Sequence, residues 1–270
     1  MPLYAHLLAI CRRGVAQARS AERLVACPEA YIALPPLGRE RLRPRAMKGE
    51  ARFYIDVHTH TPNANAAISV VDASGCDPVP VAGNGIVYSV GIHPCNIPSN
   101  FQDEIQRITL LSLNESIAAI GECGFDRTSK YSVELQKSVF SELAAISRKE
   151  AMPMLIHCVH ATDLLLQFSG LMPGEGMWIV HGFRGKPATM LQLIKAGFSV
   201  SFGAKANIDS VKACPDERIF LETDTTMPTS LCETYNCFSA LRGENLESVV
   251  ARNFMRIFGE ANSIGLENNE

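Results

Sequence analysis

Short apolar runs rich in β-branched and aromatic residues recur along the chain from Phe53 onward, and stretches with a helical period separate many of them. The apolar runs predict eight strands, near 53–58, 67–72, 86–92, 116–121, 153–157, 177–181, 198–202 and 218–223. The helical stretches predict helices over 101–113, 132–151, 161–168, 187–196 and 244–258. This alternation is typical of a parallel α/β architecture, and eight strands favour a TIM-type (β/α)8 barrel.

The beginning of this pattern departs from a regular barrel. Only residues 61–66 separate the first predicted strand from the second, whereas a parallel crossover needs a dozen or more residues. The next link, 73–85, is rich in Pro and Gly and shows no helical period. We therefore expect the barrel to lack one or two of its early helices.

Residues 1–50 differ in composition from the rest of the chain. They are rich in arginine, and Arg12 and Arg13 follow the first apolar stretch, whereas a secretory signal places its positive charges before that stretch. We predict a poorly ordered N-terminal extension over 1–50, one barrel domain over 51–260 and a short tail over 261–270. Because the first convincing strand begins just after Met47, we expect Met47 to be the natural start.

Composition narrows the function classes. With 270 residues and 47% hydrophobic content, the chain can form one large core. A net charge of -3 and a pI near 6.2 argue against a broad basic surface, but they allow local contacts to a few phosphates. Nine scattered cysteines without a Cys-x-x-Cys pair indicate a reducing compartment, so we expect a soluble, cytoplasmic protein. No apolar run is long enough to span a bilayer.

Histidines and acids lie where the predicted strands end. In the first run, FYIDVHTH, alternation places His58 and His60 on one face, roughly 6–7 Å apart along the strand. An isolated His-x-His is more often the polar face of a half-buried strand, but the later strand ends carry His93, Glu122, His157, His181 and Asp224. Each of these alone has an ordinary structural interpretation, such as a core histidine or a helix cap. In a barrel they converge on one rim, and imidazoles and carboxylates are ligands for Zn, Mn or Mg-like ions.

Taken together and in order, these stretches resemble the TatD family of metal-dependent hydrolases, also called TatD-type deoxyribonucleases. The resemblance extends over about residues 53–259. The matching stretches are DVHTH (56–60), GIHP (91–94), IGECGFD (120–126) with Gln136 and Phe140 on the next helix, PMLIHCVHA (153–161), VHGFRGKP (180–187), GFSVSFG (197–203), ETD (222–224) and NFMRIFG (253–259).

The resemblance implies a site that holds two divalent metal cations, Mg, Mn or Zn. The positions of His58, His60 and Asp224 match the ligands of one ion, and those of His157 and His181 match ligands of the second. Glu122 matches the acid that bridges the two ions. Two ions can stabilise the charge that develops in phosphodiester hydrolysis, and Asp224 is the expected general base.

Two further residues are candidates for substrate binding. His93 matches a histidine that contacts phosphate or a metal ligand, and the alternative is a histidine that fixes the turn before Pro94. Arg184, after the sixth strand, is a candidate phosphate contact, whereas we interpret Lys186 nearby as an ordinary solvated loop charge.

The chain also departs from the family pattern. Val159 stands where many members carry an arginine, and the loop after Asp224 is cut to TTMPTS, which indicates a compact subgroup. We expect cleavage of DNA phosphodiester bonds at an accessible strand end. The alternatives are hydrolysis of another ester or amide, such as an aminoacyl ester on transfer RNA or a small metabolite, and a non-catalytic binding protein. The complete set of expected ligands argues against a non-catalytic protein.

Overall fold

The structure is a computed structural model that describes residues 53–225 and 230–260. The predicted N-terminal extension over 1–50, the expected start at Met47 and the predicted tail over 261–270 lie outside the described residues.

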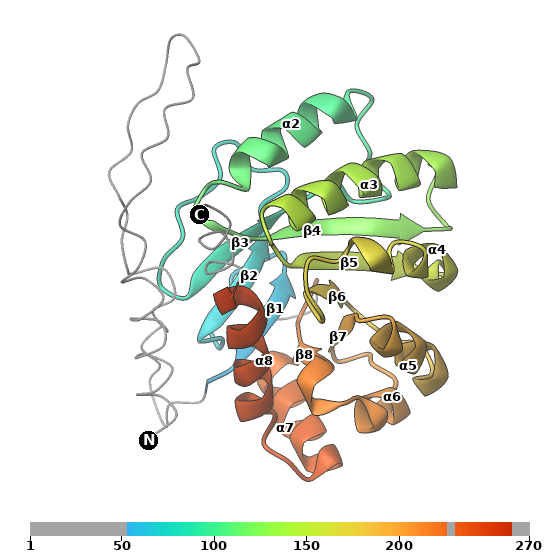
Figure 1. The fold of residues 1–270 in the computed structure, drawn as a ribbon. Coiled ribbons are helices and arrows are strands. Elements are labelled where there is room, and N and C mark those ends of the chain that lie inside the picture. The colour runs from blue at the N-terminus through green and yellow to red at the C-terminus, as the bar shows by residue number, and fades with distance from the viewer. Residues whose placement is uncertain (1–52, 226–229, 261–270) are drawn as a thin grey trace, which may run out of the picture.

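Eight parallel strands form one sheet in the order β1-β2-β3-β4-β5-β6-β7-β8, and the sheet curves into a nearly closed barrel (Figure 1). The strands are β1 (Ile55–Thr59), β2 (Ile68–Asp72), β3 (Ile86–Val90), β4 (Ile117–Asp126), β5 (Met154–Val159), β6 (Trp178–Val180), β7 (Ser199–Phe202) and β8 (Ile219–Leu221). The predicted fold class and all eight predicted strands are confirmed. One boundary was wrong, because β4 extends to Asp126, where it still pairs with Val159 of β5.

The barrel closes between β1 and β8 at two different levels. Near the carboxyl ends of the strands, Thr59 and Asp224 form a parallel bridge, and the Asp224 amide donates to the His58 carbonyl oxygen at 3.0 Å. Near the start of β1, the Tyr235 hydroxyl accepts from the Ile55 amide at 3.1 Å and donates to the Ile55 carbonyl oxygen at 2.9 Å. A side chain therefore satisfies the β1 backbone where the short β8 does not pair with it.

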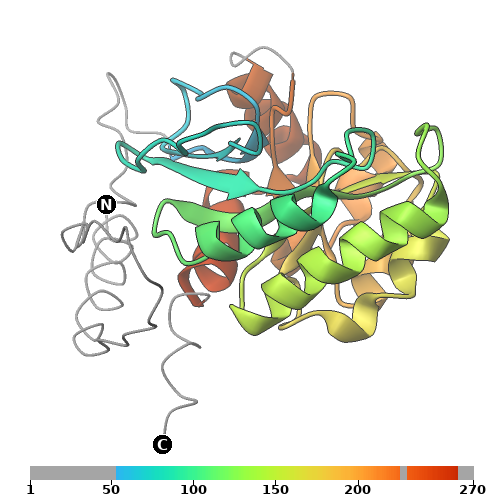
Figure 2. The same ribbon diagram turned by 90° about the horizontal axis from the view of Figure 1, so that it is seen from above.

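Helices pack on the outside of the sheet, as the view from above shows (Figure 2). They are α2 (Phe101–Leu111), α3 (Val133–Lys149), α4 (Thr162–Leu166), α5 (Pro187–Lys195), α6 (Ile208–Ala213), α7 (Ser230–Arg242) and α8 (Leu246–Glu260), with 3-10 turns η1 (Ser169–Leu171) and η2 (Asp216–Arg218). The structure shows no helix between β1 and β3, where all residues are described, which confirms that early barrel helices are missing.

Helix α3 shows how the helices are fixed to the sheet. The Ser132 side chain caps its N-terminus by accepting from the Leu135 amide at 3.2 Å. On its buried face, the Phe140 ring lies 4.8 Å from the Phe125 ring of β4 and 5.6 Å from the Trp178 ring of β6, measured between centroids. This packing holds the outer face of β4, so the inner face is positioned to present polar side chains. Among the described residues, we find no helix with the length and hydropathy of a membrane span.

Candidate metal centre

Glu122 lies in the middle of β4. The sequence had instead predicted that it lies at the end of the strand. The glycines on either side of it let β5 approach closely. A Cβ atom on Gly121 would lie 2.5 Å from the Leu155 carbonyl oxygen, and one on Gly124 would lie 2.0 Å from the His157 carbonyl oxygen. Both glycines also have φ near +140°, at +145° and +142°, a conformation that favours glycine. The IGECG sequence therefore brings β5, and with it His157, against Glu122.

Five imidazoles surround the Glu122 carboxylate. Two of them face one carboxylate oxygen and three face the other, so the two oxygens have separate environments. The contacts to Oε2 are His58 Nε2 at 3.4 Å and His60 Nε2 at 3.6 Å. The contacts to Oε1 are His93 Nε2 at 3.1 Å, His157 Nδ1 at 2.8 Å and His181 Nε2 at 2.8 Å.

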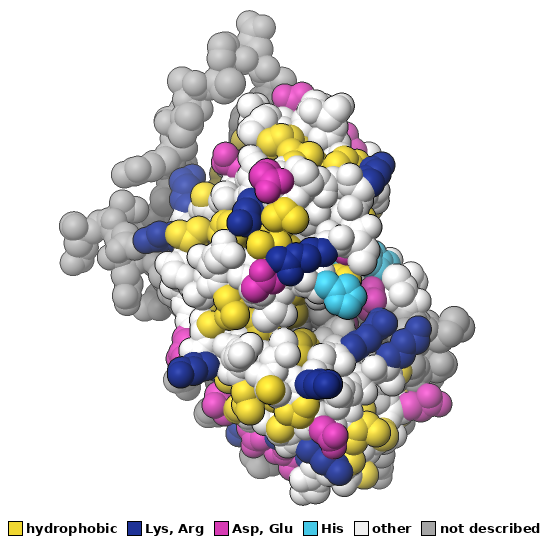
Figure 3. Space-filling model, turned by 90° about the vertical axis from the view of Figure 1, so that its right-hand side faces the viewer, with side chains coloured by type: hydrophobic (Ala, Val, Ile, Leu, Met, Phe, Trp, Pro, Cys, Tyr) yellow, Lys and Arg dark blue, Asp and Glu magenta, His cyan; other side chains and the backbone are white. Residues whose placement is uncertain are grey.

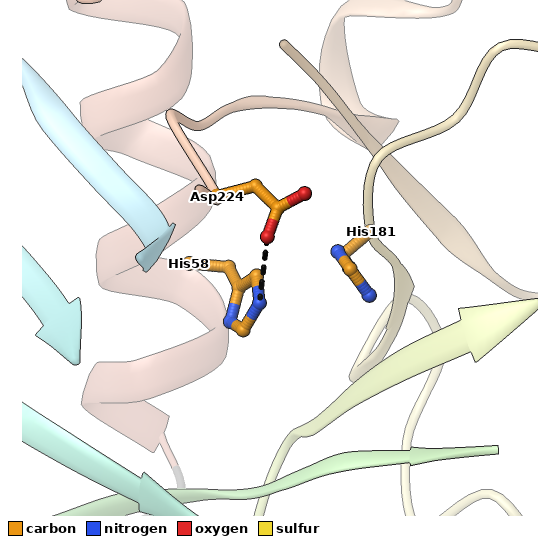
Figure 4. A group of neighbouring side chains, drawn as sticks. All are labelled: His58, His181 and Asp224. Atoms are coloured by element: carbon orange, nitrogen blue, oxygen red, sulfur yellow. Dashed lines mark ion pairs between the residues drawn. The ribbon is translucent and has the colours of Figure 1, made fainter. Parts of the chain in front are cut away.

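Asp224 completes the cluster from the far side of the barrel. Its Oδ1 lies 3.8 Å from His58 Nε2 and 3.5 Å from His60 Nε2. Figure 4 shows its carboxylate beside His58, with His181 on the other side. Asp224 has φ +53°, an unusual conformation for a residue other than glycine, and the bridge to Thr59 helps to hold it. All six predicted metal ligands thus meet at one rim of the barrel.

The clustered ligand atoms form three overlapping groups in which all atoms lie within 4.8 Å of one another. The groups are His58, His60 and Glu122; His58, His181 and Asp224; and His93, Glu122 and His157. Glu122 belongs to two of these groups, one with His58 and His60 and one with His93 and His157. A ligand that bridges two ions requires such an arrangement.

Acidic side chains hold three of these histidines from outside. Asp72 Oδ2 lies 3.5 Å from His60 Nδ1, and Asp126 Oδ2 lies 3.1 Å from His157 Nε2. Glu222 Oε1 lies 3.6 Å from His181 Nδ1. An acid beside the outer ring nitrogen keeps a proton there and leaves the lone pair on the inner nitrogen, the one that faces Glu122.

These three acids were not among the residues predicted from the sequence. The signal was present, because Asp72 and Asp126 are the last residues of β2 and β4, and Glu222 directly follows β8. Like the ligands, they therefore lie at the carboxyl ends of strands.

His93 has the opposite hydrogen-bond arrangement. Its outer nitrogen, Nδ1, accepts from the Cys95 amide at 3.0 Å, so the lone pair lies there and the proton lies on Nε2, which faces Glu122. His93 is therefore arranged to donate a hydrogen bond into the centre rather than to bind a cation. The same Cys95 contact fixes the turn after His93. The two interpretations considered from the sequence, a histidine that fixes this turn and one that contacts phosphate or a metal ligand, are therefore compatible.

Arg184 does not join the cluster. It is exposed on the loop after β6, and in the described part of the chain no hydrogen bond or ion pair connects it to the ligand side chains. Its assignment to substrate binding stays a prediction.

The cluster strongly perturbs the ionisation of its members. Burial alone raises the pKa of Glu122, but hydrogen bonds with the surrounding histidines, first those with His157 and His181, together outweigh burial and hold that pKa well below its usual range. The hydrogen bond with Asp224, and then the one with Glu122, raises the pKa of His60 to about 10. Without a metal, protons on histidines supply the positive charge beside Glu122. A divalent cation bound by the same nitrogens would supply this charge in place of the protons.

The residues present fit a bound cation. Within the described residues, Nε2 of His58, the nitrogen that faces Glu122 and Asp224, is buried without a hydrogen-bond partner. Native proteins pair nearly all such atoms. A cation held by the inner nitrogens would polarise the rings of His58 and His181 and fix their orientation, and imidazole with carboxylate is a common donor set for divalent ions.

Comparison with known proteins agrees with this geometry. The family model for TatD related DNase matches residues 45–259. An uncharacterized metal-dependent hydrolase of Bacillus subtilis, YabD, is 31% identical over 150 residues, which cover 52% of this chain and 58% of the relative. A protein of Yersinia pseudotuberculosis named 3'-5' ssDNA/RNA exonuclease TatD is 28% identical over 150 residues, covering 50% of this chain and 56% of the relative. These two alignments span a little over half of each relative's length.

The fold is also found in solved structures. The crystal structure of YJJV, a TatD homolog from Escherichia coli, superposes with a TM-score of 0.65 at 17% identity, covering 76% of this chain and 98% of that one. At this identity the likeness concerns the fold alone. The family model, in contrast, covers most of the chain and includes every ligand position described above. The chain therefore belongs to the TatD family.

Proposed function

We propose that this protein is a metal-dependent hydrolase that cleaves phosphodiester bonds at the end of a nucleic-acid strand, with two divalent cations bound at the Glu122 centre. The observation that carries the proposal is the division of the five imidazoles between the two oxygens of Glu122. Two relatives support a nucleic-acid substrate: a protein of Yersinia pseudotuberculosis is named an exonuclease, and one of Schizosaccharomyces pombe is named deoxyribonuclease Tat-D.

The contacts to the two oxygens of Glu122 support two cation positions. His58, His60 and Asp224 would hold one ion together with Oε2 of Glu122. His157 and His181 would hold the other together with Oε1. When bound, the ions supply Lewis-acid charge beside the scissile phosphate.

The protein's own side chains would bind the substrate and move the proton. Burial raises the pKa of Asp224, but its hydrogen bond with His60 and the charges of His181 and His58 together lower that pKa below its usual value, so Asp224 is ionised at neutral pH. An ionised carboxylate at this position can accept a proton from the attacking water. His93 would donate from Nε2 to a non-bridging phosphate oxygen, because the Cys95 amide occupies its Nδ1. Arg184 would pair with a phosphate farther along the strand.

The test is hydrolysis of single-stranded DNA labelled at either end, with Mg, Mn or Zn added to metal-stripped protein. The Asp224→Asn protein is the test variant, and Asp209→Asn, an exposed acid in the first turn of α6, is the matched control. We expect metal-dependent shortening from one end that Asp224→Asn abolishes and Asp209→Asn retains. Intact DNA together with cleavage of small esters would support the alternative of another ester substrate, and full activity of Asp224→Asn would refute the proposed base.

A further inference from the structure

The loops at the carboxyl ends of the strands divide by charge into two halves of the rim. The basic half, the loops 127–132, 160–161, 181–186 and 203–207 after β4 to β7, carries no Asp or Glu and holds Arg127, Lys130, Arg184, Lys186 and Lys205. The opposite half, the described loops 222–225, 60–67, 73–85 and 91–100 after β8 and β1 to β3, carries no Lys or Arg of its own, and its exposed acid is Asp77. Arg107 of α2 lies against this half, where it donates to the Ser74 carbonyl oxygen at 2.8 Å. Since the whole chain has a net charge of -3, an overall basic composition does not explain this segregation.

Most cations of the basic half are available to a ligand. Arg127 is engaged, because it forms two hydrogen bonds of 2.7 Å with Asp163 and donates to the His160 carbonyl oxygen at 2.8 Å. The other four cations are exposed and form no ion pair with another described residue. Figure 3 looks onto the side toward which the β4 and β5 arrows of Figure 1 point, and it shows Lys and Arg side chains around an exposed histidine.

The basic half adjoins the ligands of the second proposed cation. His157 lies on β5 and His181 begins the loop that also carries Arg184 and Lys186. Neighbouring strands lie about 4.8 Å apart, so the four strands from β4 to β7 span about 15 Å. A chain of several phosphates that starts at the metal centre can therefore contact more than one of these loops.

We propose that a single-stranded nucleic acid bound at the centre extends over the basic half of the rim, where Lys130, Arg184, Lys186 and Lys205 contact its phosphates. This inference rests on the proposed function and adds the direction of the strand. The four cations attract successive phosphates, whereas the loops of the opposite half carry no Lys or Arg of their own. Considered by itself, Lys186 would be an ordinary solvated loop charge. In this proposal it is one of four neighbouring cations that contact the strand.

The test is equilibrium binding rather than hydrolysis, so that the strand path and the catalytic proposal can fail separately. Fluorescence anisotropy would follow a labelled single strand of about 20 nucleotides, with phosphorothioate terminal linkages that slow cleavage, on the metal-loaded full chain at several salt concentrations. The variant is Lys186→Glu/Lys205→Glu. The control is Lys195→Glu, which reverses an exposed charge in the last turn of α5, at the opposite end of the helix that Lys186 precedes.

We expect the double variant to bind about tenfold more weakly at low salt, and the slope of log affinity against log salt to decrease by about 1.4, or about 0.7 per lost phosphate contact. Lys195→Glu should match the parent. Equal slopes for the parent and the double variant would overturn the strand path even if hydrolysis is observed. A polyaspartate of equal charge that competes as well as the unlabelled strand would overturn the assignment to nucleic acid.

Discussion

Two buried carboxylates inside the barrel have opposite electrostatic surroundings. Glu122 is enclosed by imidazoles, and its hydrogen bonds with them hold its pKa well below the usual range in spite of burial. Asp56, on β1, accepts from three neutral donors among the described residues: the Thr223 amide at 2.8 Å, the Thr223 hydroxyl at 2.6 Å and Asn63 Nδ2 at 3.0 Å. Burial raises the pKa of Asp56 to about 6, because these hydrogen bonds lower it by less.

The difference separates a charged centre from a structural connection. A buried carboxylate stays ionised where cationic groups surround it, and it tends to take up a proton where only neutral donors do. Asp56 connects β1 to the residue just before Asp224, so it supports the position of the proposed base without contacting the cluster. Glu122 provides the negative charge that would bind the proposed cations.

The largest expected effect comes from removing the charge of the centre. Glu122→Gln should lower metal-dependent hydrolysis by about 10³-fold or more, the scale of losing one preorganised charge-stabilising group. Single-turnover rates with saturating Mn would measure the loss. A rate within tenfold of the parent would show that the Glu122 charge is not the basis of the activity.

Metal affinity should depend steeply on pH, because cations displace protons from the centre. His60 has a pKa of about 10 in the metal-free protein and must lose its proton to bind a cation. Affinity should therefore rise with pH, about tenfold per pH unit for each proton displaced. Titrations with Mn between about pH 6 and pH 8 would measure this slope, and a pH-independent affinity would contradict the account of the charge balance.

A smaller effect is expected from the acids behind the histidines. Asp72→Ala removes the carboxylate beside His60 Nδ1 and should lower metal affinity by about 10- to 100-fold, as is usual for partners of metal-binding histidines. Asp77→Ala, an exposed acid in the following loop, is the control and should keep the parent affinity. If both variants bind metal equally well, Asp72 does not orient His60.

The smallest effect concerns Asp56 and is seen in stability. Its pKa is about 6 in the folded state, against 3.8 for an unperturbed aspartate, so the folded state binds this proton more tightly and loses that advantage as pH rises. The free energy of unfolding of the metal-free parent, minus that of Asp56→Asn, should fall by up to about 3 kcal/mol between about pH 4 and pH 7. Urea unfolding at several pH values measures the difference. A rise with pH would show that Asp56 is stabilised as an anion.

The strands and the clustering of the candidate ligands were predicted from the sequence better than the helices and the outer residues. The strands followed from continuous apolar runs, and the cluster followed from polar residues at the ends of those runs. Helix α7 was not predicted although Leu231, Tyr235 and Phe238 are buried at helical spacing, because Cys, Thr and Asn between them have low helix propensity. The division of the histidines into cation ligands and a hydrogen-bond donor required the positions of Asp72 and the Cys95 amide, which only the folded chain defines.

The most direct test of the central claim, two cation positions joined by Glu122, is calorimetric titration of the metal-stripped full chain with Mn. The account predicts two ions per chain for the parent, with release of protons, and loss of at least one ion in Glu122→Gln. Binding of a single ion by the parent, or of two ions by Glu122→Gln with unchanged affinity, would contradict it.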